Sequence, residues 1–174
     1  FTATKGIYTI KATSTTLTGS GKLAVGDLIT VTGTTNNNST FTVSTVVSTL
    51  EITVAEVVTS ENADGSTTVT LDHVGFVSDK SKGDGYYSQP DGVHTVAYQV
   101  NSTMAGAIKM QGSLATTPTE DDWFDISGTT LTSDQSTTNH AYNFTGNFVW
   151  VRAKTETSNA SGNPSMVTSI LLNN

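Results

Sequence analysis

Apolar and polar residues alternate with a period of two along most of this chain, which is the pattern of β-strands. The clearest runs are residues 93–100 (VHTVAYQV) and 147–154 (NFVWVRAK). Earlier in the chain, residues 29–33, 40–46 and 50–54 repeat the pattern. No window combines a sustained apolar spacing of about 3.6 residues with helix caps. The pattern therefore predicts an all-β protein.

Turn-forming residues separate these strands and divide the chain into two blocks. The first block covers residues 1–77 and the second covers residues 91–174. Between them, residues 78–90 (SDKSKGDGYYSQP) are rich in Gly, Ser and charge and show no strand pattern. Such a composition predicts an interdomain linker or an arm. Strands recur about every ten residues, which favours a barrel or a sandwich.

The second block carries a resemblance in the order of its strands and aromatic residues. A turn at residues 104–106 is followed by Gln-Gly-Ser-Leu at 111–114 and by an acidic stretch that leads into Trp-Phe at 123–124. The run GNFVWVRA at 146–153 comes later. This order resembles a β-sandwich module of tailed-phage virion proteins, found in decoration, head-fibre and tail-fibre proteins. The resemblance implies an antiparallel, jelly-roll-like β-sandwich.

The first block resembles a second module of the same class of protein. The residues that carry it are 25–31 (VGDLITV), 41–43 (FTV), 52–54 (ITV) and a hairpin at 61–69. They are similar to a small β-barrel module that is widespread in phage virion proteins. The resemblance implies a barrel that serves as a structural module, and it identifies no functional residues in this chain.

Aromatic residues supply candidate anchors and candidate contacts. Three of them lie on or beside alternating strands of the second block and are predicted to anchor its core: Trp123, Phe124 and Trp150. Three others have no evident place in a core and are predicted to lie at an interface: Phe1, Tyr86 and Tyr87. Local packing of the two tyrosines between the blocks is the alternative.

Charge and composition exclude several classes of function. The chain has 8 Lys and Arg against 15 Asp and Glu, a net charge of −7. This balance argues against nonspecific binding to nucleic acid or to an anionic membrane. The absence of cysteine excludes zinc–thiolate sites, disulfides and thiol nucleophiles. No apolar run approaches the roughly 18 to 20 residues that span a bilayer.

No catalytic constellation is evident. His73, His94 and His140 share no metal-ligand spacing and are expected to be structural. The acidic cluster at 120–122, with Asp125, is expected to be a solvated loop beside a buried Trp. Its alternatives are a calcium site and a glycosidase-type carboxylate pair. We therefore predict no catalytic residues, no metal and no cofactor.

Together these observations predict a non-enzymatic structural protein on the outer surface of a tailed-phage virion. Capsid decoration is the first expectation within that class. The expected partners are copies of the same chain, as a homotrimer, and the major capsid protein or other virion proteins. The alternative is a receptor- or glycan-binding module of a head or tail fibre, whose partner is a host-surface glycan.

Overall fold

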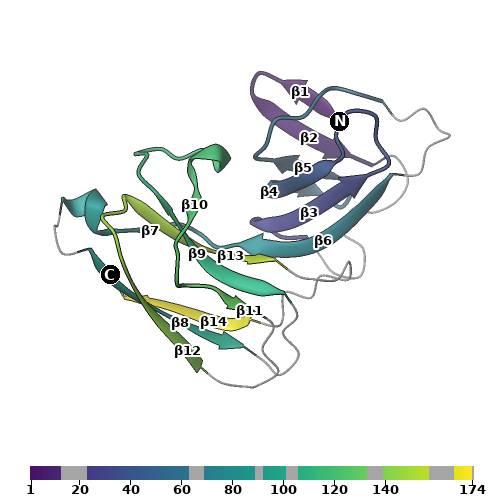
Figure 1. Ribbon diagram of the computed structural model, residues 1–174. Coiled ribbons are helices and arrows are strands. Elements are labelled where there is room, and N and C mark those ends of the chain that lie inside the picture. Colours follow the sequence, from purple (N-terminus) through teal and green to yellow (C-terminus); the bar gives the residue numbers. More distant parts are fainter. Residues whose placement is uncertain are drawn as a thin grey trace. The chain divides into compact units, whose positions relative to one another are not determined.

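The computed structural model consists of two compact units, the first comprising residues 1–76 and the second beginning at Val77 (Figure 1). The residues that it describes are 1–12, 23–62, 69–88, 92–100, 106–132, 139–156 and 167–173. Within them every element is a β-strand except two short 3-10 helices, so the predicted all-β class is confirmed. The predicted turns at 61–69 and 104–106 fall mostly outside the described residues.

Antiparallel strands build the first unit in the order β1-β2-β5-β4-β3-β6. Their bounds are β1 Thr2–Thr4, β2 Ile7–Lys11, β3 Asp27–Thr32, β4 Ser39–Ser48, β5 Glu51–Val54 and β6 Thr70–Val77. Apolar residues, most of them β-branched, form its core: Ile10, Leu23, Ile29, Val31, Phe41, Val43, Ile52, Val54 and Val58. The closed barrel expected for this block stays a prediction.

Phe1 is part of this unit and does not stand apart from it. Its ring is partly buried against the core and lies 6.4 Å from the ring of Phe41. Its ammonium group donates a hydrogen bond to the Glu61 carbonyl oxygen at 3.0 Å, and the Glu61 N–H donates to the Phe1 carbonyl at 3.2 Å. The structure therefore gives Phe1 a place in a module core, which the sequence pattern did not.

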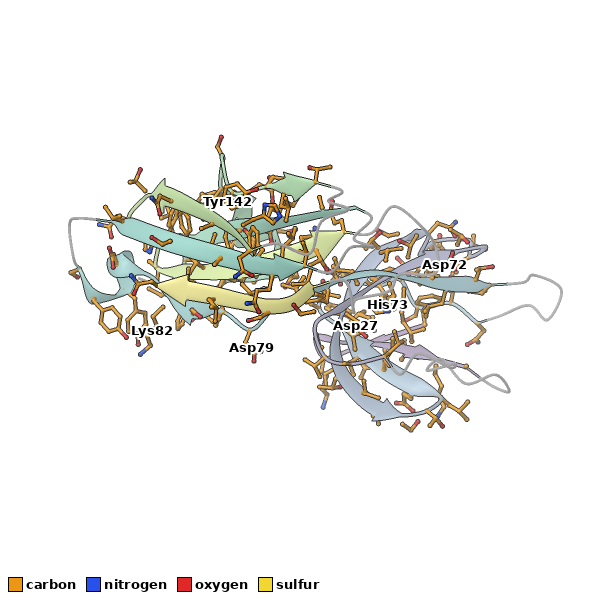
Figure 2. All side chains as sticks on the ribbon, turned by 90° about the horizontal axis from the view of Figure 1, so that it is seen from below. Asp27, Asp72, His73, Asp79, Lys82 and Tyr142 are labelled. Atoms are coloured by element: carbon orange, nitrogen blue, oxygen red, sulfur yellow. The ribbon has the colours of Figure 1, made fainter. Side chains whose placement is uncertain are left out.

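A buried carboxylate and a histidine meet where β3 pairs with β6. The pairing shifts register between Leu28 and Ile29, and this brings Asp27 and His73 together (Figure 2). His73 Nε2 lies 3.4 Å from Asp27 Oδ1 and 2.8 Å from the Gly75 carbonyl oxygen. The interaction with Asp27 raises the pKa of His73, although burial opposes the shift.

The second unit contains two antiparallel sheets. One has the order β12-β8-β14, and in the other β13 lies between β7 and β9, with β10 and β11 also paired to β9. The strands are β7 Ser81–Lys82, β8 Val93–Val100, β9 Ala107–Ser113, β10 Phe124–Asp125, β11 Leu131–Thr132, β12 Asn139–Thr145, β13 Trp150–Glu156 and β14 Val167–Asn173. The 3-10 helices are η1 Asp84–Tyr87 and η2 Glu120–Asp122.

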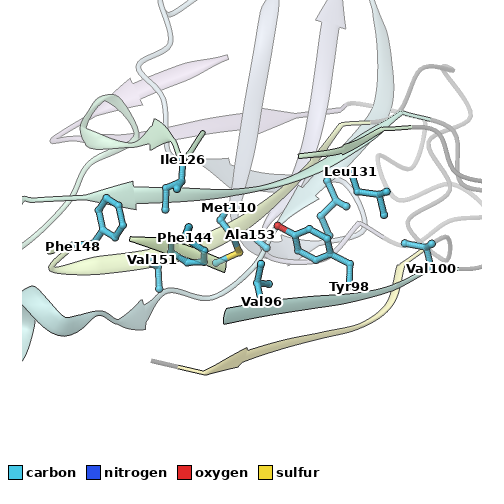
Figure 3. Close-up of a cluster of buried hydrophobic side chains, with 11 residues drawn as sticks. Val96, Tyr98, Val100, Met110, Ile126, Leu131, Phe144, Phe148, Val151 and Ala153 are labelled. Carbon is cyan, nitrogen blue, oxygen red and sulfur yellow. The ribbon is translucent and has the colours of Figure 1, made fainter. Parts of the chain in front are cut away.

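Side chains from both sheets share one core (Figure 3). It consists of Val96, Tyr98, Val100, Ile108, Met110, Ile126, Leu131, Phe144, Phe148, Val151 and Ala153. The one phenol hydroxyl in this core belongs to Tyr98, and it donates a hydrogen bond to the Thr129 carbonyl oxygen at 2.9 Å. Two sheets that pack across a common core are consistent with the predicted β-sandwich. The jelly-roll detail stays a prediction.

Phe148 fills a space that glycines keep open. A Cβ on Gly112 would lie 2.6 Å from Phe148 Cδ1, and a Cβ on Gly146 would overlap Phe148 Cζ. A Cβ on Gly83 would lie 2.5 Å from the Phe148 carbonyl oxygen, and one on Gly85 would lie 2.8 Å from it. These approaches are closer than any side chain permits, so each of the four positions requires glycine.

Residues 78–88, expected to belong to a linker, are built into the second unit. Ser81–Lys82 pairs with β13, Gly83 N–H donates to the Val149 carbonyl at 3.0 Å and Gly85 N–H donates to that of Phe148 at 2.8 Å. Asp84 is buried. The composition of this segment is that of a linker, but its glycines serve close backbone approach and not flexibility.

We expect Phe148→Ala to lower the free energy of unfolding by about 3–5 kcal/mol, because it removes a buried ring from a space that glycines cannot refill. The control is Phe124→Ala, since Phe124 is 44% exposed and should cost much less. Urea titration of both variants measures the difference. Equal losses would contradict the packing described for Phe148.

The Asp27–His73 pair predicts a pH-dependent contribution to stability. Because the folded pKa of His73 is raised, the contribution is fully present below the unfolded value of about 6.5 and is lost as pH rises through the folded value. His73→Gln should therefore destabilise the protein more at about pH 5 than at about pH 9. In an Asp27→Asn background this difference between the two pH values should shrink.

Candidate functional site

The outward face of β13 carries the large polar and aromatic side chains. Val151 and Ala153 point into the core, so Trp150, Arg152 and Lys154 point to the opposite face. Trp150 is half-buried, and its indole N–H donates to the Thr116 carbonyl oxygen at 3.0 Å. The prediction that Trp150 anchors the core is therefore wrong, because the smaller residues of the alternating run face inward.

Trp123 and Phe124 also lie outside the core cluster. Trp123 is half-buried, and the guanidinium carbon of Arg152 lies 4.1 Å from its ring centroid. Phe124 is 44% exposed, and its ring lies 6.0 Å from that of Phe148. Both rings therefore cover polar or edge positions of the sheet and are not the central anchors that the sequence predicted.

The carboxylates of the acidic loop, residues 120–125, contact basic and polar side chains, including Arg152 on this outward face of β13. Glu120 accepts two hydrogen bonds from the Arg152 guanidinium, at 2.9 and 2.8 Å. Asp122 accepts from the backbone N–H and the hydroxyl of Thr119, and these hydrogen bonds lower the pKa of Asp122. Asp125 pairs with Lys109 at 2.8 Å and accepts from Gln111. Most carboxylates of the cluster are thus engaged in structural contacts.

The histidines likewise have structural partners. His94 is fully buried, stacks on Phe144 at 4.9 Å and lies 3.0 Å from the Gly146 carbonyl oxygen through Nε2. His73 contacts Asp27, as described above. His140 is half-buried on β12. Within the described ranges, no group of three or more His, Asp or Glu residues is placed to hold a metal ion.

A different group of side chains forms an exposed aromatic surface on the second unit, which we call the aromatic–lysine surface. It consists of Lys80, Lys82, Tyr86, Tyr87 and Trp150. The rings of Tyr86 and Trp150 meet edge-on at 5.1 Å, and those of Tyr86 and Tyr87 at 5.2 Å. Tyr86 is 43% exposed and Tyr87 58%. The three rings are therefore in contact with one another, and the two tyrosine rings are open to solvent.

Two ammonium groups lie over these rings. Lys80 Nζ is 4.5 Å from the Trp150 ring centroid, and Lys82 Nζ is 4.1 Å from that of Tyr86 and 5.6 Å from that of Tyr87. Lys82 lies opposite Trp150 in the pairing of β7 with β13. Each ammonium group is attracted by the negative face of a ring. The rings and lysines thus fix one another's positions.

The two lysines were missed from the sequence. Lys80 and Lys82 stand two positions apart just before Tyr86 and Tyr87, and this spacing was the available signal. The composition of the segment indicated a linker, so the lysines were not considered as partners of the tyrosine rings. The tyrosines, by contrast, were singled out, and the structure places them at the surface.

The described part of the chain has no helix long and apolar enough to cross a membrane. In comparisons with protein-family models, curated proteins and solved structures, nothing matches this chain.

We expect Glu120→Gln to destabilise the protein by about 1–3 kcal/mol, because it weakens the hydrogen-bonded ion pair of the buried Arg152. The matched control is Asp121→Asn, the same chemical change at the neighbouring exposed position, which should stay within about 0.5 kcal/mol. Chemical denaturation of both variants provides the measurement. Indistinguishable values would mean that the Glu120–Arg152 pair does not hold this loop.

Proposed function

We propose that this chain is a non-enzymatic structural protein on the outer surface of a tailed-phage virion, where it acts by binding. The resemblance of both blocks to modules of such proteins supports the location. Capsid decoration is our first choice, with further copies of the chain, as a homotrimer, and the major capsid protein as partners. A β framework with few charged residues suits a particle surface, where a protein has to keep its shape.

One observation carries the binding role. Exposed Tyr86 and Tyr87 are held on a defined platform, whereas Glu120, Asp122 and Asp125 are engaged in structural contacts. A reactive site needs titratable groups that converge on a free space. A binding site needs exposed rings in fixed positions, because little conformational entropy is then lost on association.

A second candidate is a receptor- or glycan-binding module of a head or tail fibre. The specific observation in its favour is that Trp123 and Trp150 lie outside the core, with Trp150 beside the exposed tyrosines. Aromatic faces offer sugar rings a flat, weakly negative surface. This candidate and capsid decoration can be separated by the occupant of the aromatic–lysine surface.

The test uses particles that lack this protein. Purified chain, with its mass measured by light scattering, is mixed with such particles, which are then sedimented. We expect an oligomer and saturable co-sedimentation. A strict monomer that leaves the particles bare but binds a soluble saccharide would reject decoration in favour of the fibre module.

A further inference from the structure

We infer that two copies of this chain associate through the outward side of the sheet β12-β8-β14, face to face, about a two-fold axis that runs parallel to β8. We call this side of the sheet the β8 face. The inference goes beyond the proposed function and requires neither the virion location nor the homotrimer. A two-fold contact can join two single chains or two chains of neighbouring oligomers.

The register of the sheet shows which side chains form the β8 face. The sheet lies on one side of the core of the second unit (Figure 1). Val96 and Tyr98 point into that core, so Thr95, Ala97 and Gln99 point outward. Residues paired directly across antiparallel strands share a face. The partners of these three residues on β12 and β14 therefore complete the β8 face.

The central row of the β8 face has large and small side chains at opposite ends. It consists of Ala141 on β12, Ala97 on β8 and Leu171 on β14, which are paired across the three strands. Leu171 is 59% exposed, whereas each alanine presents only a methyl group. The row therefore carries a protruding side chain over β14 and short side chains over β8 and β12.

A two-fold axis parallel to β8 makes this row complementary to itself. The axis passes between the Ala97 residues of the two copies and places β14 of one copy over β12 of the other. Each Leu171 then lies over Ala141 of the second copy. An axis in the same plane but perpendicular to the strands would place Leu171 over Leu171. Shape complementarity therefore selects the axis parallel to β8.

The polar rows on either side agree with the same axis. One row consists of Asn143, Thr95 and Asn173, so Asn173 of each copy would lie over Asn143 of the other. Amide groups both donate and accept hydrogen bonds, so two facing amides can pair. Thr95 donates to Asn143 at 2.9 Å and orients that amide. In the other row Ser169 would lie over Asn139, which is again a pair that can hydrogen-bond.

Charge favours a second copy as the occupant of the β8 face. The described strands β8, β12 and β14 contain no Asp, Glu, Lys or Arg, although the net charge of the chain is −7. The outward face of β13 in the other sheet carries Arg152 and Lys154. Two β8 faces can therefore meet without bringing like charges together. A ligand recognised by its charge would find no opposite charge on this face.

The size of the β8 face predicts a weak contact between isolated chains. Strands about 4.8 Å apart that rise about 3.3 Å per residue give this face an area of roughly 300 Å² in projection. A standard interface buries about 800 Å² on each partner. The contact would gain strength where copies are held side by side, because the effective concentration is then high. The solution measurement therefore has to reach high protein concentration.

The experiment places charges on the two-fold axis. Because the axis brings Ala97 of each copy together, Ala97→Arg or Ala97→Glu alone should oppose like charges. An equimolar mixture of the two variants should oppose unlike charges. The matched controls are Ala115→Arg and Ala115→Glu, the same changes at a half-buried alanine outside this sheet. Sedimentation equilibrium of the full chain gives the mass from about 1 μM to about 1 mM. Circular dichroism checks that each variant is folded.

We expect the mass of the unmodified chain to rise at least about twofold above that of its smallest species over this range. Each Ala97 variant alone should associate at least about tenfold more weakly, and the mixture should return to within about threefold of the unmodified chain. Each Ala115 variant should stay within about twofold. Leu171→Ala should weaken association at least about fivefold, because it removes the protruding side chain from both ends of the contact.

Three results would overturn the inference. The first is an unmodified chain whose mass stays constant up to the highest concentration. The second is an equal loss at Ala97 and Ala115, or no recovery in the mixture, since residues at position 97 would then not face each other. The third is a trimer of single chains that the Ala97 substitutions dissociate, which would assign the β8 face to a three-fold contact.

The proposed capsid decoration is tested separately, by rebinding of the unmodified chain to particles. Constant mass together with particle rebinding would reject the two-fold contact and retain decoration. Association that responds to Ala97 as expected, together with bare particles, would retain the contact and reject decoration.

Discussion

The packing of Phe148 between glycines is the constraint on which the second unit depends most. Its ring lies against Gly112 and Gly146, and its carbonyl oxygen against Gly83 and Gly85. One aromatic residue therefore joins the core, the strand β9 and the first residues of η1 with the glycine before them. Because a Cβ at any of these glycines would lie less than 3 Å from another atom, none of the four positions can hold a larger residue without moving Phe148.

This packing has a consequence on the opposite face of the sheet. With Gly83 and Gly85 bonded to the backbone of Val149 and Phe148, η1 is held where the Tyr86 ring meets Trp150. The position of Lys82 is set in the same way, because Lys82 pairs in register with Trp150. A buried contact thus positions an exposed surface, and the surface contains no side chain of that core.

Alternation along the sequence predicted the strands well but not their orientation. A period of two divides residues 147–154 into two faces, and large aromatic residues suggested that the Trp150 face was buried. The structure buries Val151 and Ala153 instead, because Phe148 and the residues of the facing sheet already fill the space.

The prediction that residues 78–88 form a linker was wrong for a related reason. Glycine is common in flexible segments and also where two stretches of backbone approach closely. Only the position of Phe148 shows that Gly83 and Gly85 belong to the second kind.

Charge is divided between the two ends of this outward face. Arg152 and Lys109 are matched by Glu120 and Asp125, so their charges fix the loop that lies on the sheet. Lys80 and Lys82 lie over aromatic rings, whose negative faces attract a cation and hold it in place. The first arrangement stabilises the fold and leaves little field for a ligand. The second holds exposed tyrosine rings in fixed positions, and this difference is why the proposed binding role is placed at the lysine end and not at the acidic loop.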